Sequence, residues 1–179
     1  STQSLVFSLK DGPWTLRGGI DHANATVNAR QIELFNGPAH LQLDGSYQTD
    51  RRDFELSGLI RNFDPSQFVA TAPARLNAAF GAAGQWGNAP QPSIEASLIV
   101  TDSQLFNEPL AGQAQARIRW PEISNLQLDI QQGRNRLRAS GAIGQPDDRL
   151  QISIEAPHLP SQLLPAGISG DLHGTAELA

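Results

Sequence analysis

Apolar and polar residues alternate along most of this chain with a period of two. Because successive side chains of a β-strand point to opposite faces of a sheet, this pattern predicts strands with one apolar and one polar face. No segment keeps a 3.6-residue period, which disfavours long helices. We expect roughly a dozen strands, and the alternating runs that predict them include residues 41–47, 54–60, 76–80, 94–100, 114–120, 126–130, 137–143 and 150–156.

The same pattern occurs twice, ninety-six residues apart: residues 31–47 read QIELFNGPAHLQLDGSY, and residues 127–143 read QLDIQQGRNRLRASGAI. The matching pairs are Ile32/Leu128, Leu34/Ile130, Gly37/Gly133, Leu41/Leu137, Gly45/Gly141, Phe54/Leu150, Leu56/Ile152, Phe63/Leu159 and Leu76/Leu172. We therefore expect a single domain over residues 1–179, made of two units of about 96 residues that are truncated at both ends. Since the alternation runs to both ends of the chain, the sequence is typical of a piece of a longer array.

Tight turns indicate how the strands pair. Asn36-Gly37 suits the two-residue type I′ turn of an antiparallel hairpin, and Gln132-Gly133 is its counterpart in the second copy. Each turn reverses the strand direction, which disfavours a parallel β-helix. The pairs predicted on this basis are Phe35–Pro38, Glu33–His40, Leu34–Ala39 and Ile32–Leu41, with Asp129–Arg136 and Leu128–Leu137 in the second copy.

Together these features predict an all-β fold, a curved and mainly antiparallel repeat sheet that forms an open groove with an apolar interior. Asp64 before Pro65 is a typical N-cap, so short helical crossovers are expected at residues 64–68 and, in the second copy, at 160–164. The apolar positions mix Leu and Ile with many Ala and Gly, which would leave the groove under-filled by protein. The residues expected to line it are Ile32, Leu34, Leu41, Leu43, Phe54, Leu56, Ile60, Leu76, Phe80, Ile94, Leu98, Ile118, Leu126, Leu128, Ile130, Leu137, Ile143, Leu150, Ile152 and Ile154.

Composition narrows the range of partners. The net charge is −5 and the only lysine is Lys10, whereas a nucleic-acid partner requires a clustered basic face, so we expect no nucleic acid. Three arginines align on one strand face, which we interpret as a solvated outer face with Asp129 opposite: Arg134, Arg136 and Arg138. The absence of cysteine excludes disulfides and cysteine-based metal sites.

No motif indicates catalysis, a metal or a cofactor. The nucleophile elbow, the P-loop and the dinucleotide fingerprint are all missing. The histidines stand outside any H-x-x-x-H spacing: His22, His40, His158 and His173. Asp147-Asp148 lies in a turn sequence rather than in a paired-carboxylate site. The tryptophans are interpreted as core or groove-lining residues rather than as a sugar platform: Trp14, Trp86 and Trp120. We expect a protein that is not an enzyme.

Three degenerate motifs recur in a fixed order: R-L-x-A-x-G-x-hydrophobic at 136–143, D-x-L-x-hydrophobic-x-hydrophobic-x-A-P-x-L at 148–159, and L-x-G-x-A-x-L at 172–178. In this order and repetition the chain resembles the TamB family of the AsmA-like clan over nearly its whole length. The resemblance implies an internal periplasmic fragment of a protein anchored in the inner membrane of a Gram-negative bacterium, folded as a long β-groove, or β-taco.

The resemblance also implies a function. TamB-like proteins guide phospholipid between the inner and outer membranes and are linked to outer-membrane protein and autotransporter assembly. Their outer-membrane barrel partner, TamA, would be contacted by regions outside this fragment. On this basis the groove residues would bind phospholipid acyl chains without catalysis. Two alternatives stay open: a chaperone-like scaffold for unfolded outer-membrane strands, and a glycan-binding or adhesin-type β-solenoid.

Overall fold

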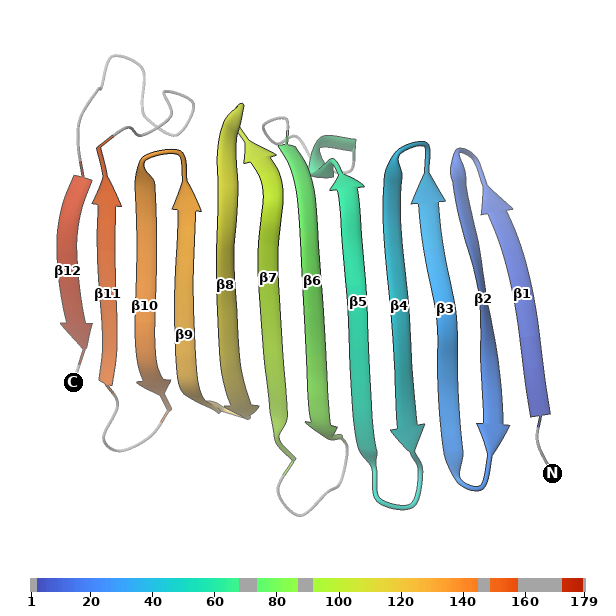
Figure 1. Cartoon of the computed structure of the whole chain (residues 1–179). Helices are drawn as coiled ribbons and strands as arrows, with labels where there is room; N and C mark the ends of the chain where they lie inside the picture. Colours follow the sequence, from blue (N-terminus) through green and yellow to red (C-terminus); the bar gives the residue numbers. More distant parts are fainter. Residues whose placement is uncertain (1–2, 68–73, 87–91, 145–148, 158–171, 179) are drawn as a thin grey trace.

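A computed structural model describes residues 3–67, 74–86, 92–144, 149–157 and 172–178. They form one open sheet in which each strand is antiparallel to the strand before it in sequence (Figure 1). The described strands are β1 (Gln3–Asp11), β2 (Trp14–Ala23), β3 (Thr26–Asn36), β4 (Ala39–Gln48), β5 (Asp53–Phe63), β6 (Ala74–Gln85), β7 (Ile94–Leu105), β8 (Glu108–Arg119), β9 (Glu122–Gln132), β10 (Asn135–Ile143), β11 (Arg149–Ala156) and β12 (Leu172–Leu178). The predicted all-β, antiparallel, open architecture is confirmed.

One short 3₁₀ turn, η1 (Pro65–Gln67), follows β5. The Ser66 amide donates a hydrogen bond to Asp64 Oδ1 at 2.9 Å, so Asp64 caps this turn as predicted. The corresponding segment of the second copy, residues 160–164, lies outside the described residues.

The two predicted hairpins form, but the predicted pairing is wrong by two residues in both. The turn residues are Gly37-Pro38 and Gly133-Arg134, so that Asn36 pairs with Ala39, and Gln132 pairs with Asn135. The observed pairs are Phe35–His40, Leu34–Leu41, Glu33–Gln42 and Ile32–Leu43, with Asp129–Arg138, Ile130–Leu137 and Leu128–Ala139 in the second copy. Because the shift is an even number of residues, every side chain keeps its predicted face.

The physical reason for this shift lies at the first turn position. Gly37 and Gly133 both have φ of +56°, while proline holds φ near −65°, which fits a type II′ turn with glycine in the first central position. A type I′ turn at Asn36-Gly37 would make Pro38 one residue of the closing pair, where its missing N–H could not donate.

The repeat is visible in the strand positions. β9 occupies the span of β3 moved on by ninety-six residues, and β10, β11 and β12 follow β4, β5 and β6 in the same way. Equivalent pairs face each other in both copies, for example Leu34–Leu41 and Ile130–Leu137.

Every second strand from β3 to β9 contains a β-bulge with one residue at positive φ. These residues are Gln31, Asn62, Asp102 and Asn125, with φ between +48° and +52°. Asn and Asp tolerate this left-handed conformation better than other non-glycine residues. Because a bulge bends its strand and increases the local twist, the sheet is curved at regular intervals.

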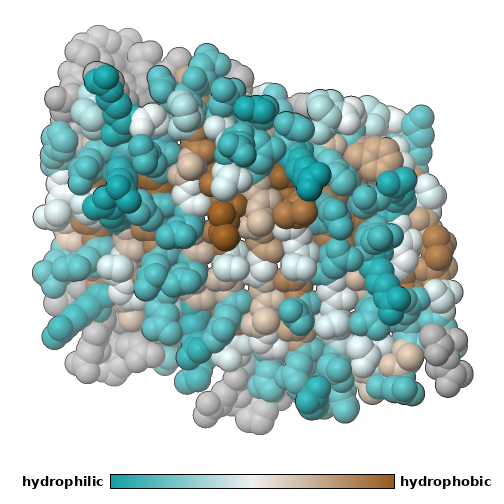
Figure 2. All heavy atoms as spheres, viewed as in Figure 1, coloured by the Kyte–Doolittle hydropathy of each residue, from teal (hydrophilic) through white to brown (hydrophobic). Residues whose placement is uncertain are grey.

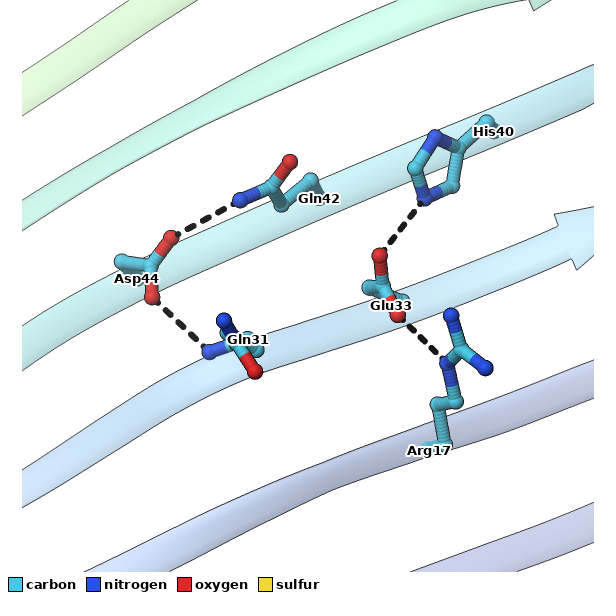
Figure 3. A network of polar contacts seen from close by, with 6 residues as sticks. All are labelled: Arg17, Gln31, Glu33, His40, Gln42 and Asp44. Atoms are coloured by element: carbon cyan, nitrogen blue, oxygen red, sulfur yellow. Dashed lines mark hydrogen bonds and ion pairs between the residues drawn. The ribbon is translucent and has the colours of Figure 1, made fainter.

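The backbone amide at a bulge is paired by a side chain from the next strand. The Gln31 amide donates to Asp44 Oδ1 at 2.8 Å, and Asp44 Oδ2 also accepts a hydrogen bond from Gln42 Nε2 at 3.3 Å (Figure 3). In the next hairpin the Asn62 amide donates to Asn77 Oδ1, also at 2.8 Å. The bulges at Gln31 and Asn62 are therefore each held by one polar side chain across the ladder.

Asn77 connects two bulges. Besides accepting from Asn62 on β5, its Nδ2 donates to the Asp102 carbonyl on β7 at 2.7 Å. Its own amide donates to Ser103 Oγ at 2.8 Å, and Ser103 is only 3% exposed. This network joins the bulges of β5 and β7 through one side chain of β6.

We expect Asn77→Ala to lower the free energy of unfolding by about 2 kcal/mol, because it leaves the Asn62 amide and the Asp102 carbonyl without these partners. Urea denaturation measures the change. Asn28→Ala, in β3 on the polar face, is the matched control and should change stability by less than about 0.5 kcal/mol. Equal stability of the two variants would contradict the role given to Asn77.

The sheet has no conventional core. Figure 1 shows a single layer, with no described element lying across the sheet. Among the described residues the buried hydrophobic ones are Ala39, Ala74 and Ala156, and no large side chain is fully buried. A sheet with one apolar face normally buries that face against a second layer, and no described element provides such a layer here.

Candidate functional site

The apolar face consists of rows of side chains that cross the strands, with one residue from each strand. Cross-strand partners share a face, so the rows follow directly from the observed register. One row from β4 to β11 is Leu43, Gly58, Phe80, Leu98, Ala114, Leu128, Ala139 and Ile152. The neighbouring row is Leu41, Ile60, Ala78, Val100, Gly112, Ile130, Leu137 and Ile154.

All twenty residues expected to line the groove lie on this face. Ten belong to the two rows above, and Ile32 and Leu34 extend those rows onto β3 opposite Leu43 and Leu41. The others stand in flanking rows of the same face: Phe54, Leu56, Leu76, Ile94, Ile118, Leu126, Ile143 and Leu150. The structure thus gathers them into one continuous surface rather than into separate clusters.

Glycines let the large side chains of this face lie down in the plane of the sheet. A Cβ added at Gly58 would stand 2.3 Å from Phe80 Cζ, and one added at Gly18 would stand 2.4 Å from Ile32 Cδ1. Gly45 and Gly112 make room in the same way for Leu56 and Ile130, respectively. The apolar side chains therefore pack sideways against neighbouring strands, which supports the sheet without a second layer.

Because these side chains pack against neighbouring strands, the side of each that points away from the sheet stays exposed to solvent. Most residues of the two rows are half-buried, and Leu98 is 37% exposed. At the first edge strand, Leu5 and Leu9 of the same face are 60% and 63% exposed. Contiguous exposed apolar surface of this kind is typical of interaction sites.

The opposite, polar face carries paired charges. On it, Glu33 accepts a hydrogen bond from Arg17 Nε at 2.5 Å and lies 3.3 Å from His40 Nε2 (Figure 3). The Arg17 guanidinium also stacks over the Phe35 ring, 5.3 Å from its centroid. The hydrogen bond from Arg17 lowers the pKa of Glu33 below its ordinary value, with His40 contributing in the same direction.

A second charged cluster joins β9 and β10. Arg136 Nε donates to Asp129 Oδ1 at 2.8 Å and its Nη2 donates to Oδ2 at 2.5 Å, while Arg138 Nε lies 3.8 Å from Oδ2. The Arg136 hydrogen bonds lower the pKa of Asp129 and raise that of Arg136. The predicted Arg136–Asp129 proximity holds as a diagonal contact, but Arg134 lies in the turn and not on the strand face.

This cluster predicts a pH effect. Because the folded-state pKa of Asp129 is lowered, its stabilising contribution is present above its ordinary pKa of 3.8 and is lost as the pH falls through the lowered value. We expect wild type to be more stable than Asp129→Asn at neutral pH. The difference in their free energies of unfolding should disappear below about pH 3.8. Urea unfolding of both proteins between pH 7 and pH 2.5 measures it. A difference that stays constant over this range would contradict the assignment.

The remaining histidines that the structure describes lie on different strands. No group of histidine and carboxylate ligands suited to a metal occurs among the described residues. His22 lies on β2 and His173 on β12, at opposite ends of the sheet, while His158 and Asp147-Asp148 lie outside the described residues. No helix in the described ranges is long and apolar enough to cross a membrane.

The tryptophan interpretation needs correction. Trp86 and Trp120 are 63% and 85% exposed, so neither belongs to a core. Trp120 follows the last residue of β8 and forms part of the turn before β9. It therefore does not continue the apolar side of β8, as the alternation predicted. Only Trp14, at the start of β2, keeps a half-buried position.

Sequence reasoning missed two features of the polar face. The first is the series of polar side chains that satisfy bulge amides, which only the register brings together. The second is a pair of hollows, each about 500 Å³ in volume, above small residues of β5 to β11. The serines, glycines and glutamines that form them were visible only as the polar half of the alternation.

No protein-family model, no curated protein and no solved structure matches this chain. Its class is therefore defined by its own fold and surfaces: an open, single-layer antiparallel sheet with one continuous apolar face and one polar face.

Proposed function

We propose that this chain is a non-catalytic conduit segment that shelters the acyl chains of phospholipids on its apolar face. The observation that carries the proposal is the continuity of the apolar rows across the sheet, combined with the absence of any described element covering them. Acyl chains are the natural occupant of such a surface, because it offers no pattern of hydrogen-bonding groups that a polar ligand could read.

The dimensions agree with this occupant. Twelve strands at ~4.8 Å spacing extend about 55 Å across the sheet. An acyl tail covers about 15 Å, half of a ~30 Å hydrocarbon core. A tail lying along a row would thus contact about three strands, and several lipids could follow one another along the face.

The apolar face can hold an acyl tail and still let it move along the sheet. Burial of apolar surface contributes about 25 cal/mol per Å², which holds a tail against the face. In both rows large apolar side chains are mixed with Ala and Gly, and no polar group among the described residues of the two rows fixes a tail in one place. A tail can therefore slide from strand to strand at little cost.

The wider setting is part of the same proposal. By its resemblance to the TamB family, the segment would belong to a periplasmic bridge between the two membranes of a Gram-negative bacterium. The protein would serve outer-membrane protein and autotransporter assembly, and TamA would be engaged by regions outside this segment.

One observation favours a second candidate function. On β1, Leu5, Val6 and Leu9 are 60%, 81% and 63% exposed. Exposed apolar side chains of this kind are suited to contact another apolar polypeptide segment, which is what a scaffold for unfolded outer-membrane strands would require.

The test is extraction and mass spectrometry of lipid that co-purifies with the chain, followed by titration with a fluorescent phosphatidylethanolamine. The lipid-conduit proposal predicts co-purified phospholipid and saturable binding. A strand-binding scaffold predicts instead that a peptide from an outer-membrane β-strand binds while phospholipid does not. Absence of lipid in both measurements would overturn the proposal.

A further inference from the structure

The two hollows of the polar face adjoin each other and form a trough. One, of about 500 Å³, runs over β7 to β11, and the other, of about 530 Å³, runs over β5 to β9. They share Ser97 and Gln115. Volumes of this size lie within the range of ligand-binding clefts. The floor of the trough follows a single row of cross-strand partners: Gly81, Ser97, Gln115, Gln127, Ser140 and Gln151.

The floor offers neutral hydrogen-bonding groups at regular steps. Gln115 Nε2 donates to Gln127 Oε1 at 2.7 Å, a bond that does not use the Gln127 NH₂ group or the Gln115 side-chain oxygen. Serine hydroxyls lie on either side, at Ser97 and Ser140. The depth at Gly81 depends on its missing side chain, since a Cβ there would stand 3.3 Å from Ser97 Oγ.

Beside the floor, the trough has a strip of apolar side chains and charged side chains that form ion pairs. Ile99 lines one hollow, and its row continues beside the trough through its cross-strand partners Ala79 and Leu59. Leu59 and Ile99 are 37% and 51% exposed. Figure 2 shows such a hydrophobic patch near the centre of an otherwise hydrophilic face. The lining charges are largely paired, Arg117 with Glu95 and Arg138 with Asp129.

These features select an uncharged, hydroxyl-rich ligand with an apolar ring face. Paired charges disfavour a polyanion such as a nucleic acid, which requires clustered unpaired cations. An extended peptide advances ~3.3 Å per residue, which does not match the ~4.8 Å spacing between strands. A pyranose unit in an extended β-linked glycan advances by nearly one strand spacing. Each sugar could therefore meet one floor residue, and over β5 to β7 its C–H face could lie on the apolar strip.

We propose that this trough is a binding site for a linear, uncharged β-linked glycan, which lies across the strands from β5 to β11. The site is on the face opposite the apolar rows, so glycan and lipid would bind independently.

The experiment is a titration of the isotopically labelled chain with two uncharged hexasaccharides, cellohexaose and chitohexaose, followed by amide chemical shifts. Shifts concentrated at Ser97, Gln115, Gln127 and Ser140, with at least one hexasaccharide, are expected. A monosaccharide should bind more weakly, because it meets only one step of the floor.

Two variants test the location. Ser97→Trp fills the point shared by the two hollows and should weaken hexasaccharide binding at least about tenfold. Gln127→Ala removes an amide without adding bulk and should weaken it several-fold. Ser8→Trp, on β1 of the polar face but outside the trough, is the control and should bind like wild type. All three should bind fluorescent phosphatidylethanolamine equally, which separates this proposal from the lipid proposal.

Two results would overturn the inference. One is the absence of localised shifts with both hexasaccharides. The other is unchanged binding in both trough variants. If an unstructured decapeptide produces the same shifts and displaces the sugar, the trough is a peptide site and the glycan assignment is wrong.

Discussion

Ile130→Asp is expected to abolish lipid loading while leaving the chain folded. Ile130 lies in the middle of an apolar row, between Gly112 and Leu137. A carboxylate there stands in the path of acyl tails, and transfer of such a charge into an apolar contact costs several kcal/mol. Because the face is open, water can hydrate the new carboxylate when no lipid is present, so the fold survives. Lipid co-purification and the circular-dichroism melting temperature, measured on the same sample, test both parts.

Gln131→Asp is the matched control for this change. It places the same carboxylate one residue further along β9, on the polar face, where Gln131 is exposed. Lipid loading in this variant should equal that of wild type. If Ile130→Asp unfolds the chain, the apolar face is a closed core and not an open surface. If it stays folded and loads lipid normally, the conduit proposal fails at this row.

Gly141→Ala is expected to cause the largest loss of stability of the substitutions considered, about 3 kcal/mol or more. Gly141 has φ of +140°, a conformation that residues with a side chain rarely adopt. A Cβ there would stand 1.8 Å from the Arg149 carbonyl oxygen, so β10 and β11 would have to separate locally. Chemical denaturation measures the change in the free energy of unfolding.

Gly174→Ala provides the comparison, because nothing lies within 4 Å of the position that its Cβ would take. It should be nearly neutral. Gly12→Ala should fall between the two: its Cβ would also meet open space, but φ of +56° makes any side chain unfavourable by roughly 1 kcal/mol. The loss of stability should be largest for Gly141→Ala, intermediate for Gly12→Ala and smallest for Gly174→Ala. Any other order would show that close approach of the neighbouring strand does not determine the loss.

The period-two alternation was sufficient to predict the fold class and the face of every expected groove residue. A strand allows only two orientations, so a residue such as Leu128 or Leu137 needs only its neighbours in sequence to be assigned to a face. The error in hairpin register shows the limit of this reasoning. Moving Leu41 from Ile32 to Leu34 preserves both faces, and therefore hydrophobic pattern alone could not distinguish the two pairings.

Features that depend on two strands at once could not be predicted. Asn77 pairs the bulge amide of Asn62, fifteen residues earlier, and nothing local in either segment marks the partner. The trough on the polar face arises in the same way, since its floor takes one residue from each of several strands. Trp120 was misplaced because alternation was extended one residue beyond the end of its strand.

The strand order, in which each strand pairs only with its sequence neighbours, makes the sheet modular. Its stability approximates a sum over adjacent strands, as in an array where each unit senses only the next. Removing one hairpin therefore shortens the surface by about 10 Å and leaves the remaining pairs to rejoin. The length of such a surface can therefore change by the gain or loss of whole hairpins, while the sequences of the remaining hairpins stay the same.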